Sequence, residues 1–197
     1  SIVGLSAVVW AHHLFTSGMS DSLHLPFMIV TEIISIPTGV IFLSALGTIW
    51  LGKLHLQTPM LFALAVVFNF LIGGITGIFL ADVATDIQLQ DTYFVVAHFH
   101  YTIVGGEIFA IMGAIYYWFP KMTGRMYNER LGKLHFWSMM VMYNITFLAM
   151  FWVGVQGMNR RIADYPTDLV GGNVVVSVAA FLLTASFVPF VYNMVVS

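Results

Sequence analysis

The chain has 197 residues, of which 59% are hydrophobic and 8% are charged, and its mean hydropathy is +0.91. A water-soluble domain of this length would not tolerate so apolar a surface, which excludes the soluble classes and indicates an integral membrane protein. The formal net charge of -2 argues against nucleic-acid binding, and the absence of cysteine excludes thiolate haem ligation, iron–sulfur clusters and disulfides within the chain.

Five apolar segments are each long enough to cross a hydrocarbon core of about 30 Å. They lie near residues 26–51, 57–80, 92–118, 132–155 and 172–195. Residues 1–11 are apolar but too short for a span, and we interpret them as the end of a sixth helix. The sequence therefore predicts an all-α membrane protein, a polytopic transmembrane helix bundle with five full spans plus the end of a sixth, in one domain over residues 1–197.

The first candidate site is the pair His12-His13, at the outer end of the partial span. Adjacent imidazoles diverge in a regular helix, but at a frayed helix end the backbone can turn both toward one ion. Imidazole is a suitable ligand for copper, zinc or iron. The alternative is two solvated side chains at the membrane interface.

The second candidate site is the run AHFHY, which lies inside the third full span. Residues two apart on a helix point about 200° from each other, so His98 and His100 leave opposite faces and cannot share one metal. Polar groups at membrane depth are functional candidates by default. The run therefore predicts two separate cofactors on either side of one helix, and the alternative is two histidines bonded to neighbouring polar groups.

The third candidate site is Arg160-Arg161, in the segment GMNRRIADYP. The inner side is identified by the positive-inside rule, because it holds Lys53 and the cluster Lys121, Arg125, Arg130 and Lys133. The arginine pair lies on the opposite side, where the rule expects few cations, and an anion acceptor in the protein would account for this exception. Arginine suits carboxylates because its guanidinium group can bind them bidentately. Haem propionates are carboxylates, whereas snorkelling to lipid headgroups is the alternative.

In this order and with these intervals, WAHHLFTSGM, QDTYFVVAHFHY and GMNRRIADYP resemble the C-terminal half of subunit I of the haem-copper oxidases. The similarity extends through IPTGV at 36–40 and GITGIFLA at 74–81, and covers essentially all 197 residues. The resemblance implies that His12 and His13 bind Cu(B) and that His98 is the proximal ligand of a high-spin haem. It also implies that His100 is an axial ligand of a low-spin haem, and that Arg160 and Arg161 contact haem propionates.

The activity implied is the reduction of O2 to water at the centre held by His12, His13 and His98. This centre would be fed by the low-spin haem and coupled to proton translocation, with haems of the A type and cytochrome c as the donor. A quinol oxidase or a nitric oxide reductase of the same superfamily remains open, as does a haem electron-transfer membrane protein without oxygen chemistry. A channel or structural protein without haem is the remaining class.

The resemblance also implies that the chain is incomplete. The third Cu(B) histidine and the other low-spin haem ligand of the family lie in the N-terminal half, which we expect to come from elsewhere. The other expected partners are oxidase subunits II and III, cytochrome c or quinol, O2 and lipid, and no nucleic acid. The expected location is a bacterial or archaeal cell membrane or the mitochondrial inner membrane.

Several residues depart from the family pattern. Gln90 stands where the family usually has a histidine that helps to bind magnesium, which puts a magnesium site at Asp91 in doubt. Ile41 stands where many members have a lysine, so the lysine-based proton route cannot operate in its usual form. Glu32 and Thr38 are the candidates for a different route, although a neutral Glu32 bonded to a neighbouring helix is the alternative.

A second unexpected carboxylate, Glu107, also falls inside an apolar span. It lies seven residues beyond His100, which in a regular α-helix places both on nearly the same face. We therefore expect Glu107 on the low-spin haem side.

Overall fold

The computed structural model of the protein describes residues 2–197. Within this range the chain is helical, and its elements follow one another as α1 (Ile2–Val9), the 3-10 helix η1 (Trp10–Leu14), α2 (Asp21–Ile33), α3 (Ser35–Ile49), α4 (Thr58–Ala81), α5 (Val83–Leu89), α6 (Tyr93–Thr102), the π-helix η2 (Ile103–Ile108), α7 (Phe109–Thr123), α8 (Glu129–Val155), the 3-10 helix η3 (Thr167–Leu169), α9 (Val170–Ala185) and α10 (Phe187–Val196).

These elements combine into membrane-length units that match the five predicted spans. The units are Asp21–Ile49, Thr58–Ala81, Tyr93–Thr123, Glu129–Val155 and Thr167–Val196, and the shorter apolar helix Ile2–Leu14 precedes them. A helix satisfies its own backbone hydrogen bonds, as the membrane interior requires. The prediction of an all-α polytopic bundle is therefore confirmed.

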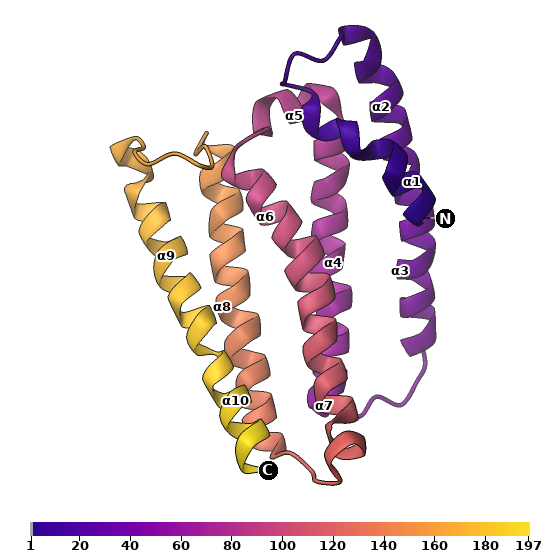
Figure 1. Ribbon diagram of the computed structural model, residues 1–197, viewed down its shortest axis with the longest axis vertical. Coiled ribbons are helices and arrows are strands. Elements are labelled where there is room, and N and C mark those ends of the chain that lie inside the picture. The colour runs from indigo at the N-terminus through magenta and orange to yellow at the C-terminus, as the bar shows by residue number, and fades with distance from the viewer. Residues whose placement is uncertain (1) are drawn as a thin grey trace.

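The spans lie side by side, with α4, α6–α7, α8 and α9–α10 in sequence and α3 at one edge (Figure 1). An aromatic core fills the space between α4, α6, α7 and α8, and its fully buried members include Phe62, Tyr101, Phe109, Tyr116 and Tyr143. Lipid tails are as apolar as these side chains, so close packing rather than burial from water must hold the helices together.

Two glycines let the helix that carries the candidate histidines approach its neighbours closely. A Cβ atom at Gly73 of α4 would lie 3.1 Å from the backbone at Tyr101 and Thr102, and one at Gly154 of α8 would meet the backbone of Phe94. Helix α6 is thus held between α4 and α8 at backbone contact, as small residues allow in membranes. This packing fixes the two faces of α6 from which His98 and His100 project.

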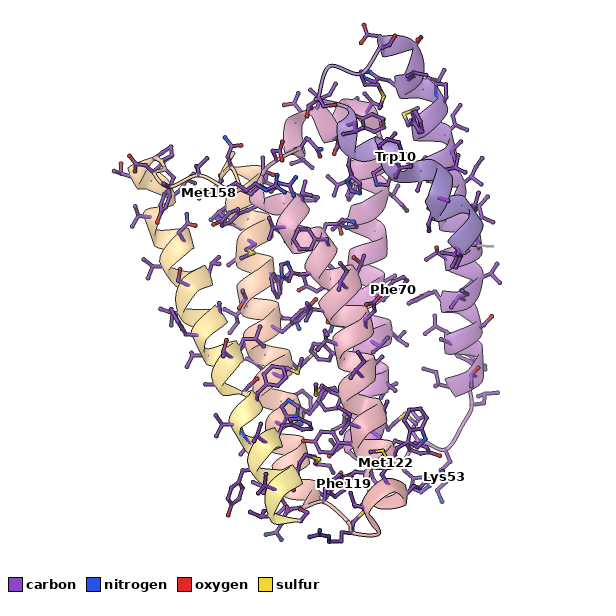
Figure 2. All side chains as sticks on the ribbon, viewed as in Figure 1. Trp10, Lys53, Phe70, Phe119, Met122 and Met158 are labelled. Carbon is purple, nitrogen blue, oxygen red and sulfur yellow. The ribbon has the colours of Figure 1, made fainter. Side chains whose placement is uncertain are left out.

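The loops alternate between the two ends of the bundle, as the predicted spans require. Lys53 and Met122 lie at one end, whereas Trp10 and Met158 lie toward the other (Figure 2). The basic loops around Lys53 and residues 121–133 therefore share one side, and the arginine pair that comes after Met158 lies on the opposite side.

Candidate metal and cofactor site

The side chains of His12 and His13 converge at the end of the first helical segment. Their Nε2 atoms are 3.0 Å apart, and the two ring planes meet at 68°. Both residues belong to η1, whose tight 3-10 turn differs from the regular α-helix in which neighbouring imidazoles diverge. Two nitrogen ligands that each lie about 2 Å from one ion are separated by about 3 Å, so the pair fits a shared metal such as copper.

The ring of His12 is oriented by a threonine. The Thr31 hydroxyl donates to the carbonyl of Phe27 at 2.6 Å, so its oxygen can accept a hydrogen bond from the Nδ1–H of His12 at 3.1 Å. With the proton on Nδ1, the lone pair of Nε2 faces Nε2 of His13 and can bind a metal that both rings share. A hydrogen bond of this kind on the other ring nitrogen is usual for metal-binding histidines.

His98 is oriented in the same way on α6. The Thr76 hydroxyl donates to the carbonyl of Ile72 at 2.9 Å, which leaves its oxygen to accept from Nδ1 of His98 at 3.1 Å. The adjacent Gly77 makes room for the ring, since a Cβ there would lie 2.9 Å from Cε1 of His98. The Nε2 lone pair of His98 is therefore free as well.

His100 faces the opposite neighbour, α8. Its Nδ1 donates to the carbonyl of Val96 at 2.8 Å, and its ring stacks on Phe147 with the centroids 4.3 Å apart. His98 contacts α4 through Thr76 and Gly77, so the two rings leave α6 on different sides, as the sequence predicts. Each ring therefore packs against a different neighbouring helix.

His98 lies near enough to His12 for the two rings to interact electrostatically, so three imidazoles gather on one side of α6. Within residues 2–197, no group of three or more His, Cys, Asp and Glu side chains is arranged around a single point. The residues present thus fit two nitrogen ligands for copper and one axial ligand for each of two haems, with further ligands required from outside the described chain.

The arginine pair has two different environments. Arg160 contacts Asp91, with Nη2 and Nε at 2.7 and 2.8 Å from Oδ1, and its backbone N–H donates to the Asp91 carbonyl at 2.8 Å. The protein thereby supplies a carboxylate acceptor for Arg160. Arg161 is exposed, and its φ of 64° lies in the left-handed region, as does the φ of 60° at Asp91. Such conformations cost about 1–3 kcal/mol each and gather at functional sites.

The residues at the expected magnesium position do not fit a cation site. Asp91 is engaged by Arg160, and the Gln90 side chain donates from Nε2 to the backbone carbonyl of His13 at 2.9 Å. Within residues 2–197, Asp91 belongs to no cluster of three His, Cys, Asp or Glu side chains.

Asp86 is a candidate functional residue that the sequence analysis does not single out. It is 2% exposed, and its Oδ2 has no hydrogen-bond partner among the described residues. Burial, together with the negative charge of Asp91, raises the pKa of Asp86 to about 7. The sequence does not indicate that Asp86 rather than Asp82 is buried, because the burial of Asp86 depends on the packing of α5 against α2 and α4.

The carboxylates inside the spans have contrasting positions. Glu32 is half-buried on α2, directly after Thr31, and the Thr38 hydroxyl donates to the Ile34 carbonyl on α3. Glu107 is exposed and lies in the π-helix η2. A π turn contains about one residue more than an α turn, so each residue of η2 turns through a smaller angle about the helix axis, and over the residues of η2 up to Glu107 the difference adds up to most of one residue's rotation. The expectation that Glu107 shares the face of His100 therefore does not hold.

His135, to which the sequence assigns no role, is fully buried in the aromatic core. Its Nδ1 lies 3.1 Å from the Tyr116 hydroxyl, and its ring packs against Phe62 and Phe190. Aromatic groups surround the ring, so a structural role accounts for it.

A family model described as Cytochrome C and Quinol oxidase polypeptide I matches residues 1–183. The cytochrome c oxidase subunit 1 of Synechocystis sp. is 49% identical over 189 residues, which cover 96% of this chain and 34% of the relative. The cytochrome c oxidase subunit 1 of Corynebacterium diphtheriae is 49% identical over 196 residues, which cover 98% of this chain and 34% of the relative. The cytochrome c oxidase polypeptide 1 of Halobacterium salinarum is 47% identical over 193 residues, which cover 98% of this chain and 32% of the relative. The chain thus spans about a third of the length of these relatives.

A solved structure also resembles the chain. The cryo-EM structure of a haem-copper terminal oxidase dimer superposes with a TM-score of 0.82 over 98% of this chain and 39% of that chain. The two sequences are 21% identical, so this likeness supports the fold alone.

Proposed function

Because the chain belongs to the cytochrome c and quinol oxidase polypeptide I family, we propose that it supplies part of the catalytic subunit of a terminal oxidase that reduces O2 to water. The observation that carries this proposal is the common orientation of three histidines. His12, His98 and His100 each bind a hydrogen-bond partner through Nδ1, which leaves Nε2 for a metal. His135 also has a partner on Nδ1, but aromatic rings of the core enclose it. The three proposed ligands differ from His135 because two of them lie on α6 and the third lies near His98. A hydrogen bond on Nδ1 is usual for metal-binding histidines.

The role of each histidine is assigned from its position. His12 and His13 would hold copper, His98 would bind one haem from the same side of α6, and His100 would bind the second haem from the opposite side. When bound, the two haems and copper would supply the redox chemistry for O2. The protein keeps the two haem ligands at fixed positions on one rigid helix, packed between α4 and α8.

The outer polar residues bind the carboxylates of the haems. Arg160 and Arg161 provide positive charge at this end of the bundle, and Asp91 holds Arg160 in place. Asp86, whose raised pKa keeps it partly protonated near pH 7, can donate a hydrogen bond to an anionic group. This hydrogen bond would give the buried Oδ2 of Asp86 the partner that it lacks among the described residues.

The proton route uses Glu32 and the hydroxyl of Thr38, because Ile41 can neither titrate nor hydrogen-bond. Glu32 adjoins Thr31, whose hydroxyl contacts His12, so its carboxyl group is close in sequence to a residue that orients the copper ligands. A Glu32→Gln variant should reduce the high-spin haem more slowly. A variant with wild-type turnover and proton uptake would remove Glu32 from the route.

The remaining parts of the enzyme lie outside this chain. The further copper and haem ligands come from the N-terminal half of the subunit, and subunits II and III complete the complex, with cytochrome c as the electron donor. The family also includes quinol oxidases, so activity with a quinol and not with cytochrome c would change the donor and leave the oxygen chemistry in place.

The proposal is tested by optical spectra of the assembled complex, reduced minus oxidised, with and without carbon monoxide. Replacing His98 with alanine should abolish the carbon-monoxide-reactive haem and leave a low-spin signal, whereas replacing His100 should do the reverse. The opposed faces of α6 are the physical reason. Loss of both signals to the same extent in either variant, in a complex shown to be assembled, would contradict the assignment of two cofactors.

A further inference from the structure

The ring of His13 lacks the support that the other three candidate ligands have. Thr31, Thr76 and the Val96 carbonyl orient the rings of the other three, but the hydrogen bond that the His13 ring makes within residues 2–197 is the contact with His12 itself. The position of His13 Nε2 must therefore depend on its main chain.

The main chain of His13 is held by Gln90. The side-chain Nε2 of Gln90 donates to the His13 carbonyl at 2.9 Å, across 77 positions of sequence. His13 is the penultimate residue of η1, and the last carbonyls of a helix have no donor within it. The amide of Gln90 supplies that donor and ties η1 to the connection between α5 and α6.

Gln90 is itself anchored on its other side. Its neighbour Asp91 is bound to Arg160 through both side chain and backbone, and Tyr93 donates its backbone N–H to the Met158 carbonyl at 2.8 Å. The segment therefore cannot drift independently of α6, which carries His98. Because this segment is fixed, its hydrogen bond to the His13 carbonyl also fixes the position of η1 relative to α6.

We propose that Gln90 is a positioning residue for the copper site, which holds the backbone of His13 so that its Nε2 stays 3.0 Å from that of His12. This inference rests on the proposed function, because it assumes that the pair binds copper. Gln90 does not touch the metal. It acts through the carbonyl of His13.

The test compares Gln90→Glu with Gln88→Glu in the assembled complex. A glutamate at position 90 has the shape of glutamine but, when ionised, cannot donate to a carbonyl. Gln88 is exposed in α5, two residues before Gln90, and makes no side-chain hydrogen bond within residues 2–197. Its change therefore adds the same charge without breaking this contact. Gln90→Ala removes the donor without adding charge, and Gln90→His restores a ring N–H of similar reach.

Copper and haem are measured by elemental analysis during dialysis against a chelator, and the infrared band of carbon monoxide on the high-spin haem is recorded. We expect copper to leave the Gln90→Glu and Gln90→Ala complexes about five-fold faster than wild type, as for loss of one hydrogen bond. The infrared band should broaden, and haem content should be unchanged. Gln88→Glu and Gln90→His should behave like wild type.

Wild-type copper retention and an unchanged infrared band in both Gln90→Glu and Gln90→Ala would overturn the inference, as would equal copper loss in Gln88→Glu. Failure of the proposed function gives a different result. In that case wild type contains no copper, or His13→Ala retains all of it.

Discussion

The Nδ1 partner of each imidazole decides which nitrogen can face a metal. Thr31 and Thr76 are useful acceptors only because each hydroxyl already donates to a carbonyl one turn earlier. A serine or threonine in a helix often makes that bond, so the sequence of a membrane helix predicts it. The pairing of each threonine with a distant histidine could not be predicted, because it depends on how α2 and α4 pack around the site.

The buried carboxyl of Asp86 gives the protein a dependence on pH. Its pKa rises from the ordinary 3.8 to about 7, so the folded state binds the proton more tightly than the unfolded state does. The contribution of Asp86 to stability is therefore full below pH 3.8 and is progressively lost as the pH rises to about 7. Above that pH the loss is complete.

An Asp86→Asn variant keeps the shape of the side chain and removes the titration. We expect its thermal stability relative to wild type to improve between about pH 4 and pH 7 and to change little above about pH 7, by at most about 4 kcal/mol in total. The measurement is the unfolding temperature of the complex across this range. Asp168→Asn, at an exposed position, is the control. Parallel pH profiles for wild type and Asp86→Asn would show that Asp86 titrates normally.

At the scale of the elements, the sequence identifies the five spans and the faces of α6 correctly but misplaces Glu107. The reason is the π-helix η2, which no periodicity argument anticipates. The Tyr143 hydroxyl donates to the His100 carbonyl at 3.0 Å, and a Cβ at Gly105 would lie 2.6 Å from that hydroxyl. A tertiary contact thus competes with the helical hydrogen bonds just after His100, and the glycines at 105 and 106 allow the backbone to widen.

The contact between α4 and α6 should depend on one glycine and not on its neighbour. A Cβ at Gly73 would lie 2.9–3.1 Å from Tyr101 and Thr102, whereas one at Gly74 has nothing within 4 Å. We expect Gly73→Ala to destabilise the complex by about 1–3 kcal/mol, because the backbone of α6 must move. Gly74→Ala should be close to neutral.

The measurement is the thermal stability of the purified complex, together with its haem content and the carbon-monoxide spectrum. Displacement of α6 moves His98 with it, so the spectrum should change in Gly73→Ala even where the complex survives purification. Equal behaviour of the two alanine variants would mean that α4 and α6 do not meet at Gly73.

At the scale of the whole molecule, the ends of the bundle differ in charge and in chemistry. Lys53 and Met122 lie at one end, and Trp10, Met158 and α5 lie toward the other (Figures 1 and 2). Trp10 begins the 3-10 helix of His12 and His13, α5 carries Asp86, and Arg160 follows Met158 by two residues and pairs with Asp91. The loops, charges and spans could be predicted from sequence because each is a local property. The link from Gln90 to His13 could not, because it joins segments that only the fold brings together.

The charge distribution predicts that the end that carries His12 and His13 faces outward and the basic loops face inward. The chain contains no cysteine, so a single introduced cysteine is a clean reporter of side. Met126 is 59% exposed in the inner loop, and Ala163 is exposed beside the arginine pair. In sealed right-side-out vesicles, a membrane-impermeant maleimide should label Ala163→Cys directly and Met126→Cys only after permeabilisation. Mass spectrometry of this chain separates its label from that on other subunits. The reverse pattern would invert the topology, and protons that reach Glu32 from the basic side would then enter from the outside.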